Sequence, residues 1–287
     1  MFKYLLYKFG QFIIHRLPLR VSYKIANFFS DIQYAVSFRD RRAVKNNLKV
    51  ILQSEEDLSD QAREVFRNFG KYLVDFFRMV KYIDEDYLNR LIKIEHQDRL
   101  DRILEHGKGC IMLSAHIGNW ELGATALARL GYPLIAVALP HKERPVNDLF
   151  NQQREHLGLT VVPSNVAVRK CVEALKSNKL VGLIADRDFS MTGETMNFFG
   201  RKAIIPRGAA IFSCRTGAPI LPTFLLREKD DTFTLSFGEP LFPKSVTDDE
   251  VEKELQLEIM NTYIKIFEQK IRENPTQWLM FREFWIE

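Results

Sequence analysis

The sequence contains 287 residues, of which 46% are hydrophobic and 27% are charged. This composition indicates a globular protein with a substantial core, and it excludes an intrinsically disordered chain. The three cysteines, Cys110, Cys171 and Cys214, cannot all form pairs and are too few for a disulfide framework. We therefore expect buried structural thiols and a reducing compartment.

Positive charge is concentrated at the beginning of the sequence. The first 50 residues hold ten Lys and Arg residues against two acidic residues, although the whole chain carries a net charge of only +4. Such a block favours an anionic partner, which is a membrane surface, a nucleic acid or an acidic protein. The glycine motifs of nucleotide-binding proteins do not occur, and the basic residues are mixed with long aliphatic ones. We therefore expect no nucleic-acid partner and favour an anionic membrane surface.

Residues 2–17 predict an amphipathic helix. At 100° per residue, one side collects apolar residues, namely Phe2, Leu5, Leu6, Phe9, Phe12, Ile13 and Leu17. The other side collects Lys3, Tyr4, Tyr7, Lys8, Gln11 and His15. No stretch of the sequence approaches the roughly 20 apolar residues of a membrane-spanning helix. The apolar face is therefore expected either to enter a membrane interface or to pack on the body of the protein, and the sequence leaves both open.

The remaining elements change character after about residue 90. Helical periodicity covers residues 21–36 and 57–82, and Ser59 or Asp60 can begin the second of these helices. Strands are then expected at 109–116, 133–139, 159–162, 180–185, 219–226 and 233–237. Helices are expected at 119–130, 145–156, 166–177 and 247–273. This alternation predicts an α/β fold with a largely parallel central sheet flanked by helices. We expect a helical, basic, membrane-associating segment at 1–90 and an α/β domain at 91–287.

The candidate catalytic residues follow the first clear strand. His116 stands at its carboxyl end, where ligands bind in sheets of this kind. Asn119 is a natural N-cap, which places Trp120 and Glu121 in the first turn of the next helix. Glu121 is then expected to accept the proton on one imidazole nitrogen, so that the other nitrogen is free to take a proton from an attacking hydroxyl.

These residues resemble a known family. His116-Ile-Gly-Asn-Trp-Glu121 is similar to the H-x-G-N-W-[DE] form of the H-x4-[DE] motif in the bacterial lipid A late acyltransferases (lauroyl/myristoyl acyltransferases) and the related phosphatidylinositol mannoside acyltransferases. Both belong to the glycerophosphate and lysophospholipid acyltransferase superfamily. The likeness extends from about residue 105 to the end. It includes Asp186-Arg-Asp188, Phe198-Phe-Gly200, Pro206-Arg-Gly208, Arg215-Thr-Gly-Ala-Pro219, Asn274-Pro275 and Gln277-Trp278.

The resemblance implies roles for single residues. His116 would be the general base and Glu121 its orienting carboxylate. Substrate-binding positions would include Asn119, Asp186, Arg187, Asp188, Glu194, Gly200 and Arg207. Glu194 resembles a position of the mannoside acyltransferases that lies close to the catalytic histidine, where it would be a second carboxylate partner. Structural alternatives stay open for most of these residues: a helix cap for Asn119, loop support for Asp186 and Asp188, an ion pair for Arg187, and a solvated position for Glu194. Arg207 at a predicted helix start would suit a phosphate.

The resemblance also implies the reaction and its setting. We expect transfer of an acyl group from an acyl carrier protein or coenzyme A thioester to a lipid hydroxyl, on the cytoplasmic face of a bacterial inner membrane, by a peripheral or monotopic enzyme. A lipid A precursor is the first choice of acceptor, which would place the protein in lipid A and lipopolysaccharide biosynthesis. The D-R-D-F-S segment leans instead toward a mannoside glycolipid.

The expected chemistry requires no cofactor and no metal, because the six histidines show no metal-ligand spacing. Two further readings remain. One is a serine hydrolase that uses Ser114, which the absence of a G-x-S-x-G motif disfavours. The other is an inactive lipid-binding relative. Chain length of the acyl group and oligomeric state do not follow from the sequence.

Overall fold

The structure is a computed structural model that describes residues 2–82, 84–163, 166–188, 193–244 and 248–286. Thr247, the expected first residue of the last helix, and Phe189-Ser190 of the D-R-D-F-S segment lie outside the described residues. A seven-stranded sheet has the order β1-β9-β8-β2-β5-β3-β4. Its strands are β1 (Ile92–Glu95), β2 (Cys110–Ser114), β3 (Leu134–Ala138), β4 (Thr160–Pro163), β5 (Leu180–Ile184), β8 (Ile220–Arg227) and β9 (Phe233–Phe237). All neighbouring pairs are parallel except β8 and β9, so the expected α/β class is confirmed.

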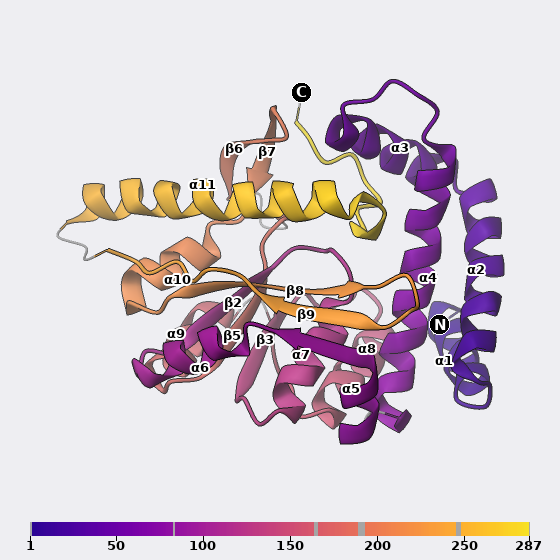
Figure 1. Ribbon diagram of the computed structural model, residues 1–287, viewed down its shortest axis with the longest axis horizontal. Coiled ribbons are helices and arrows are strands. Elements are labelled where there is room, and N and C mark those ends of the chain that lie inside the picture. Colours follow the sequence, from indigo (N-terminus) through magenta and orange to yellow (C-terminus); the bar gives the residue numbers. More distant parts are fainter. Residues whose placement is uncertain (1, 83, 164–165, 189–192, 245–247, 287) are drawn as a thin grey trace.

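Helices cover both faces of the sheet (Figure 1). One face packs against α9 (Ala167–Lys176), α10 (Gly208–Thr216) and α11 (Asp249–Glu273). The other packs against α4 (Ser59–Tyr82), α5 (Glu85–Leu91), α6 (Gln97–Glu105), α7 (Trp120–Arg129) and α8 (Arg144–His156). A short antiparallel hairpin, β6 (Glu194–Phe198) and β7 (Arg201–Ile205), stands beside α11.

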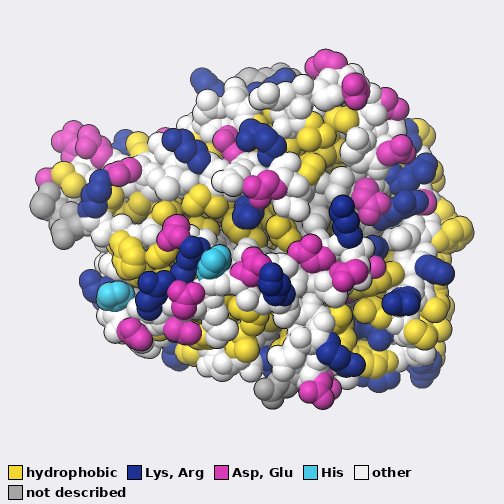
Figure 2. Space-filling model, viewed as in Figure 1, with side chains coloured by type: hydrophobic (Ala, Val, Ile, Leu, Met, Phe, Trp, Pro, Cys, Tyr) yellow, Lys and Arg dark blue, Asp and Glu magenta, His cyan; other side chains and the backbone are white. Residues whose placement is uncertain are grey.

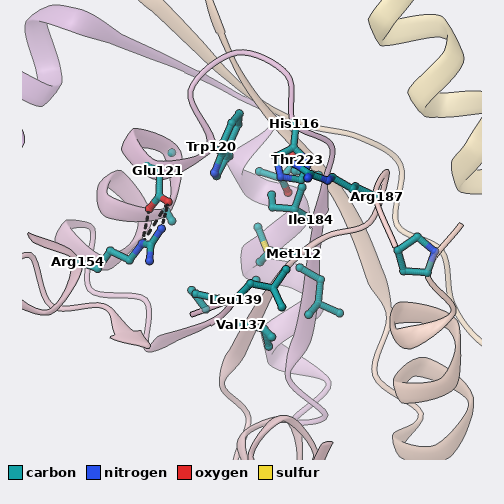
Figure 3. Close-up of a pocket in the computed structure, with 18 of the residues that line it drawn as sticks. Met112, His116, Trp120, Glu121, Val137, Leu139, Arg154, Ile184, Arg187 and Thr223 are labelled. Atoms are coloured by element: carbon teal, nitrogen blue, oxygen red, sulfur yellow. Dashed lines mark hydrogen bonds and ion pairs between the residues drawn. The ribbon is translucent and has the colours of Figure 1, made fainter. Parts of the chain in front are cut away.

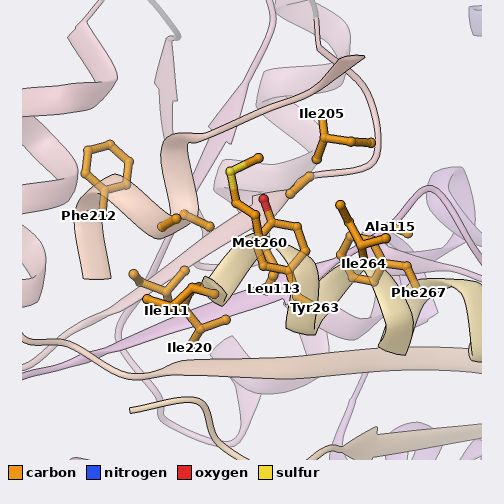
Figure 4. Packing of buried hydrophobic residues seen from close by; sticks show 14 of the residues in the cluster. Ile111, Leu113, Ala115, Ile205, Phe212, Ile220, Met260, Tyr263, Ile264 and Phe267 are labelled. Carbon is orange, nitrogen blue, oxygen red and sulfur yellow. The ribbon is translucent and has the colours of Figure 1, made fainter. Parts of the chain in front are cut away.

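Strand β2 shows why the sheet is buried on both sides. Its side chains alternate between faces, as the two-residue period of a strand requires. Ile111 and Leu113 join the core beneath α11, where they meet Tyr263 and Phe267 (Figure 4). Cys110 and Met112 join the core on the opposite face. The sequence of a strand that is buried on both faces is a continuous apolar run, and such a run predicted strand β2.

The first helices pack against α4. They are α1 (Phe2–Ile14), α2 (Leu19–Val36) and α3 (Phe38–Leu52), and α4 contacts all three. Helix α4 begins at Ser59, one of the two predicted starts. The cysteine prediction holds for Cys110 and Cys171, which are buried, whereas Cys214 is partly buried; all three thiols are free.

Candidate functional site

His116 and Asp186 lie side by side at the carboxyl edge of the sheet. Strands β2 and β5 are parallel neighbours, and their register pairs Ser114 with Ile184. His116 and Asp186 each follow one of these paired residues by two positions. The sheet therefore brings together two side chains that are 70 positions apart in the sequence.

Asp186 holds both the backbone and the ring of His116. Its Oδ2 accepts the backbone N–H of His116 at 2.9 Å, and its Oδ1 lies 2.6 Å from Nδ1 of the imidazole. The indole N–H of Trp278 also donates to Oδ2, at 2.8 Å. Burial raises the pKa of the Asp186 carboxyl, but the charge and hydrogen bonds of His116 and the hydrogen bond of Trp278 outweigh it, so the pKa lies below its ordinary value. An ionised carboxylate can only accept, so the network assigns the proton to Nδ1.

A segment near the end of the sequence holds the loop that carries His116. The backbone N–H of Leu279 donates to the carbonyl oxygen of His116 at 2.8 Å, and the N–H of Gly118 donates to that of Gln277 at 3.0 Å. Gly118 has a φ of +64°, and a Cβ there would lie 2.0 Å from the carbonyl oxygen of Leu225. Only glycine fits this position, because both the left-handed backbone and the close approach exclude a side chain.

The structure gives Glu121 a different partner from the expected one. Its carboxylate forms an ion pair with Arg154 of α8, with Nε of the guanidinium 3.0 Å from Oε2 and Nη2 2.5 Å from Oε1. Both side chains are nearly buried, at 9% and 12% exposure. Figure 3 shows this pair on a different wall of the cavity from His116. His116 therefore donates to Asp186 and not, as expected, to Glu121, because the first turn of α7 faces α8.

Asn119 is a helix cap, which was the structural alternative to a role in substrate binding. It caps α7, and its Oδ1 accepts the N–H of Leu122 at 3.1 Å. Its Nδ2 donates to Asp75 of α4 at 3.1 Å, and Asp75 also accepts from Tyr23 and Arg227. Asn119 is 1% exposed. This network ties the loop after β2 to α2, α4 and β8.

A large cavity opens beside the imidazole. Its volume is about 1080 Å³, slightly above the range of roughly 300–1,000 Å³ for small-molecule sites. Apolar side chains of the strands and of α7 and α8 form most of the wall, including Met112, Leu127, Leu134, Val137, Leu139 and Phe150. Trp120 lies edge-on to the imidazole, with ring centroids 5.0 Å apart. Figure 3 shows His116 at one end of the labelled residues and Val137 and Leu139 at the other.

Of the other predicted site residues, some line the cavity and some lie outside its lining. Arg187, Asp188 and Arg207 line the same cavity as His116, whereas Glu194 and Gly200 are not among the lining residues. Asp188 accepts the N–H of Gly193 at 2.8 Å, which fits the expected loop support. Glu194 lies 3.6 Å from Arg207 in a half-exposed ion pair.

Gly200 lies in the turn between β6 and β7, outside the residues that line the cavity. Phe199 and Gly200 there have φ angles of +52° and +78°. The turn therefore explains the glycine without a ligand, because its backbone favours a residue with no side chain.

Sequence reasoning missed Arg154 and the contacts of Trp278. Arg154 stands in a helix with other charged residues, and no motif marked it. Trp278 was noted only as part of the Gln277-Trp278 pair. Arg282 also lines the cavity, from the segment after Trp278. Among the residues that the structure describes, no three His, Cys, Asp or Glu side chains form a metal-binding group.

A second candidate surface is formed by α1, α2 and the start of α3. We call it the apolar surface, and its exposed members are Leu5, Leu6, Phe9, Phe12, Val21, Phe28, Phe29, Ile32, Val36 and Phe38. Figure 2 shows hydrophobic side chains mixed with Lys and Arg along this edge of the molecule. Of the predicted apolar face of residues 2–17, Leu5, Leu6, Phe9 and Phe12 thus point away from the body. On the opposite side of the helix, Tyr7 packs against Phe77 and Phe150. Searched over the described ranges, the helices include none that is long and apolar enough to cross a bilayer.

Comparisons with known proteins give one family match and several similar relatives. A family model described as "Bacterial lipid A biosynthesis acyltransferase" matches residues 1–286. The chain is similar to the phosphatidylinositol mannoside acyltransferase of Mycobacterium tuberculosis (strain CDC 1551 / Oshkosh), with 28% identity over 225 residues, 76% of this chain and 68% of that protein. It is also similar to the phosphatidylinositol mannoside acyltransferase of Mycolicibacterium smegmatis, with 24% identity over 286 residues, 98% of this chain and 90% of that protein.

Proposed function

Because the chain belongs to the bacterial lipid A biosynthesis acyltransferase family, we propose that it transfers a fatty acyl group from a thioester to a hydroxyl of a membrane glycolipid. The observation that carries this proposal is the imidazole of His116, which lines a large apolar cavity while its Nδ1 is engaged by a buried carboxylate. The cavity suits an acyl chain, and the imidazole suits a base beside the reacting carbonyl.

The proposed reaction is one direct transfer. Nε2 of His116 takes the proton of the acceptor hydroxyl as its oxygen attacks the thioester carbonyl carbon. The tetrahedral intermediate then collapses, the C–S bond breaks, and the thiolate leaves with the proton that the imidazolium returns. The products are an acyl ester of the lipid and a free thiol, and the enzyme needs no covalent intermediate.

The acceptor is proposed to be a glycolipid, with two candidates. The family description favours a lipid A precursor, whereas the relatives named above favour a mannosylated phosphatidylinositol. The donor is an acyl carrier protein or coenzyme A thioester. Either donor carries phosphate, and Arg187, Arg207 and Arg282 provide guanidinium groups on the cavity wall.

We propose further that the apolar surface docks on an anionic membrane. Exposed cationic side chains accompany it, namely Lys8, Arg16, Arg20, Lys24, Arg39 and Arg42. Aromatic and aliphatic side chains beside positive charge favour the interface of an anionic bilayer. Tyr7 lines the cavity from the inner side of α1, whereas Leu5 and Phe9 face outward. The cavity therefore lies directly behind the proposed membrane-facing helix, where a lipid acceptor would enter.

The first experiment is an acyl-transfer assay with the wild type and His116→Ala. Both thioester donors and both glycolipid acceptors are offered, and mass spectrometry detects a lipid that gains one acyl mass. The expected result is transfer by the wild type and a loss of at least about 100-fold in His116→Ala, the usual contribution of a general base. His156→Ala is the control, because His156 is exposed at the end of α8. Transfer that survives His116→Ala would overturn the catalytic assignment, and no transfer from any pair would favour a binding-only relative.

The membrane proposal is tested by sedimentation with liposomes. Phe28→Ser with Phe29→Ser is expected to reduce binding to vesicles that contain anionic lipid, and added salt is expected to weaken the binding of the wild type. Phe242→Ser is the control, since Phe242 is equally exposed but lies before α11, outside the apolar surface. Equal binding of the three proteins would contradict the docking surface.

A further inference from the structure

We infer that Asp186, held in place by Trp278, is the positioning residue that orients His116, and that Glu121 does not have this task. The inference rests on the proposed function, because it concerns the same imidazole. It differs from the expectation based on the H-x4-E motif, in which Glu121 orients His116.

The first support is the two-point contact. One oxygen of Asp186 accepts the backbone N–H of His116 and the other lies 2.6 Å from its ring Nδ1. A carboxylate that binds both the backbone and the ring fixes the position of the residue and the rotation of the ring together. A contact to the ring alone would fix only the rotation of the ring.

The second support is the isolation of this carboxylate from water. Asp186 is 0% exposed, and Trp278, at 3%, donates its indole N–H to Oδ2. Hydrogen bonds to a buried charged acceptor are stronger than those at a surface, because solvent does not compete. Trp278 itself lies in the segment whose backbone binds the His116 loop, and a β-bridge joins Ile117 to Trp278.

The third support is the different engagement of Glu121. Its negative charge is compensated by the guanidinium of Arg154 through three hydrogen bonds. The positive charge of the guanidinium offsets the negative charge of Glu121 at the imidazole. Glu121 therefore adds little to the stability of an imidazolium at His116. Glu121 and Arg154 instead form part of the cavity wall.

The consequence for the reaction is a fixed tautomer. Asp186 keeps the proton on Nδ1, so Nε2 is the basic nitrogen, and the ionised carboxylate stabilises the imidazolium after proton transfer. Asp186 does not itself take the proton. Asp186→Asn is therefore expected to lower kcat by about 10²- to 10⁴-fold, the scale known for a histidine that loses its orienting carboxylate.

The pH dependence separates the two carboxylates. Without the Asp186 charge the imidazolium is less stable, so the acidic limb of the pH–rate profile is expected to move to lower pH in Asp186→Asn. In Glu121→Gln combined with Arg154→Met, which removes the pair without leaving an unpaired guanidinium, this limb should stay at the wild-type pH. The other charged or titratable groups that line the cavity are unchanged in both variants, namely Tyr7, Tyr72, His141, Arg187, Asp188, Arg207 and Arg282. A shift of the limb in the Glu121→Gln/Arg154→Met variant, and none in Asp186→Asn, would overturn the inference.

Trp278→Phe tests the support of Asp186 with a matched control. It removes one N–H and keeps an aromatic ring, and Trp285→Phe removes the N–H that donates to the carbonyl oxygen of Phe198 at 2.7 Å. Trp278→Phe is expected to lower kcat several-fold with little change in KM, whereas Trp285→Phe leaves both unchanged. In an Asp186→Ala background the effect of Trp278→Phe should disappear. Equal effects of the two tryptophan variants would reduce Trp278 to a packing residue.

A spectroscopic measurement tests the inference without any activity. In ¹⁵N-histidine-labelled protein, the wild type is expected to show His116 as the Nδ1–H tautomer, and Trp278→Phe and Asp186→Asn should change its shifts. The double variant Glu121→Gln/Arg154→Met, which leaves no unpaired charge, should leave them in place. A wild-type protein that transfers no acyl group but shows this tautomer refutes only the proposed function. Acyl transfer that depends on His116 but is indifferent to Asp186 refutes only the present inference.

Discussion

The ion pair between Glu121 and Arg154 allows a stability prediction that follows from its burial. The two side chains are 9% and 12% exposed, so solvent screens them little. The aromatic residues Tyr72 and Phe76 lie nearby, and burial followed by the charge of Glu121 raises the pKa of Tyr72. Removing one partner of a buried pair leaves an uncompensated charge and costs about 3–5 kcal/mol. Arg154→Met is therefore expected to lower the free energy of unfolding by about that amount.

Two further variants make this prediction decisive. Glu121→Gln combined with Arg154→Met removes both charges and should recover most of the lost stability, because no unpaired charge remains. Arg102→Met breaks an exposed pair with Asp98, at 67% and 65% exposure, and should change stability by about 0.5 kcal/mol or less. Urea unfolding followed by circular dichroism measures all three, with an unchanged m-value as the condition for comparison. A cost below about 1 kcal/mol for Arg154→Met, or no recovery in the double variant, would refute the reasoning.

Three other outcomes are expected. Gly118→Ala should destabilise the protein by roughly 2–5 kcal/mol in the same urea assay, since the left-handed backbone and the contact with Leu225 both oppose a side chain. Because the pKa of Asp186 is lowered, its ionised form stabilises the fold at pH values above the ordinary 3.8 and this contribution is lost as pH falls below it. The stability difference between the wild type and Asp186→Asn should therefore shrink between pH 5 and pH 3, in unfolding curves measured across that range. Gly182→Leu should fill part of the cavity and shift the transferred acyl groups toward shorter chains, as read by mass spectrometry of the products.

The local signals of the sequence predicted most elements of the fold. The apolar runs and the three- and four-residue spacings predicted the strands and helices from β2 onward, and the cap at Asn119 is confirmed. Helices α3, α5 and α6 were not predicted, and the short strand β1 and the β6–β7 hairpin were missed as well. Strand β1 has only four residues, and β6 alternates polar side chains on an exposed edge, so neither forms an apolar run.

The pairing at the site could not be predicted from the same signals. The motif places Glu121 five residues from His116, but a helix turn directs its side chain toward α8. The contact of His116 with Asp186 depends on the order of strands in the sheet, which places β5 directly beside β2. The spacing of residues along the sequence does not reveal the order of the strands in the sheet. The Asp186-Arg-Asp188 segment was noted after a strand, and knowledge of the neighbouring strand would have identified its first residue as the partner.

The direction of the apolar face of α1 was also left open by the sequence. Helical periodicity identifies a face but does not say what covers it. The structure resolves this through Tyr7 and His15, whose side chains turn toward α4 and α8 and leave Leu5 and Phe9 outside. A tyrosine-containing face with mixed polarity is therefore the packed face of this helix.

The register between β2 and β5 has a consequence for how the protein matures. The contacts that build the site join residues 70 and 92 positions apart, so they close large loops and gain little from local structure. Helices of the chain can form early, whereas the imidazole acquires its carboxylate only when the central strands have paired. A partly folded chain would then lack both the aligned base and the cavity, because side chains of β2, β3, β5 and β8 line that cavity. Chemical competence and completion of the sheet would thus arise in the same event.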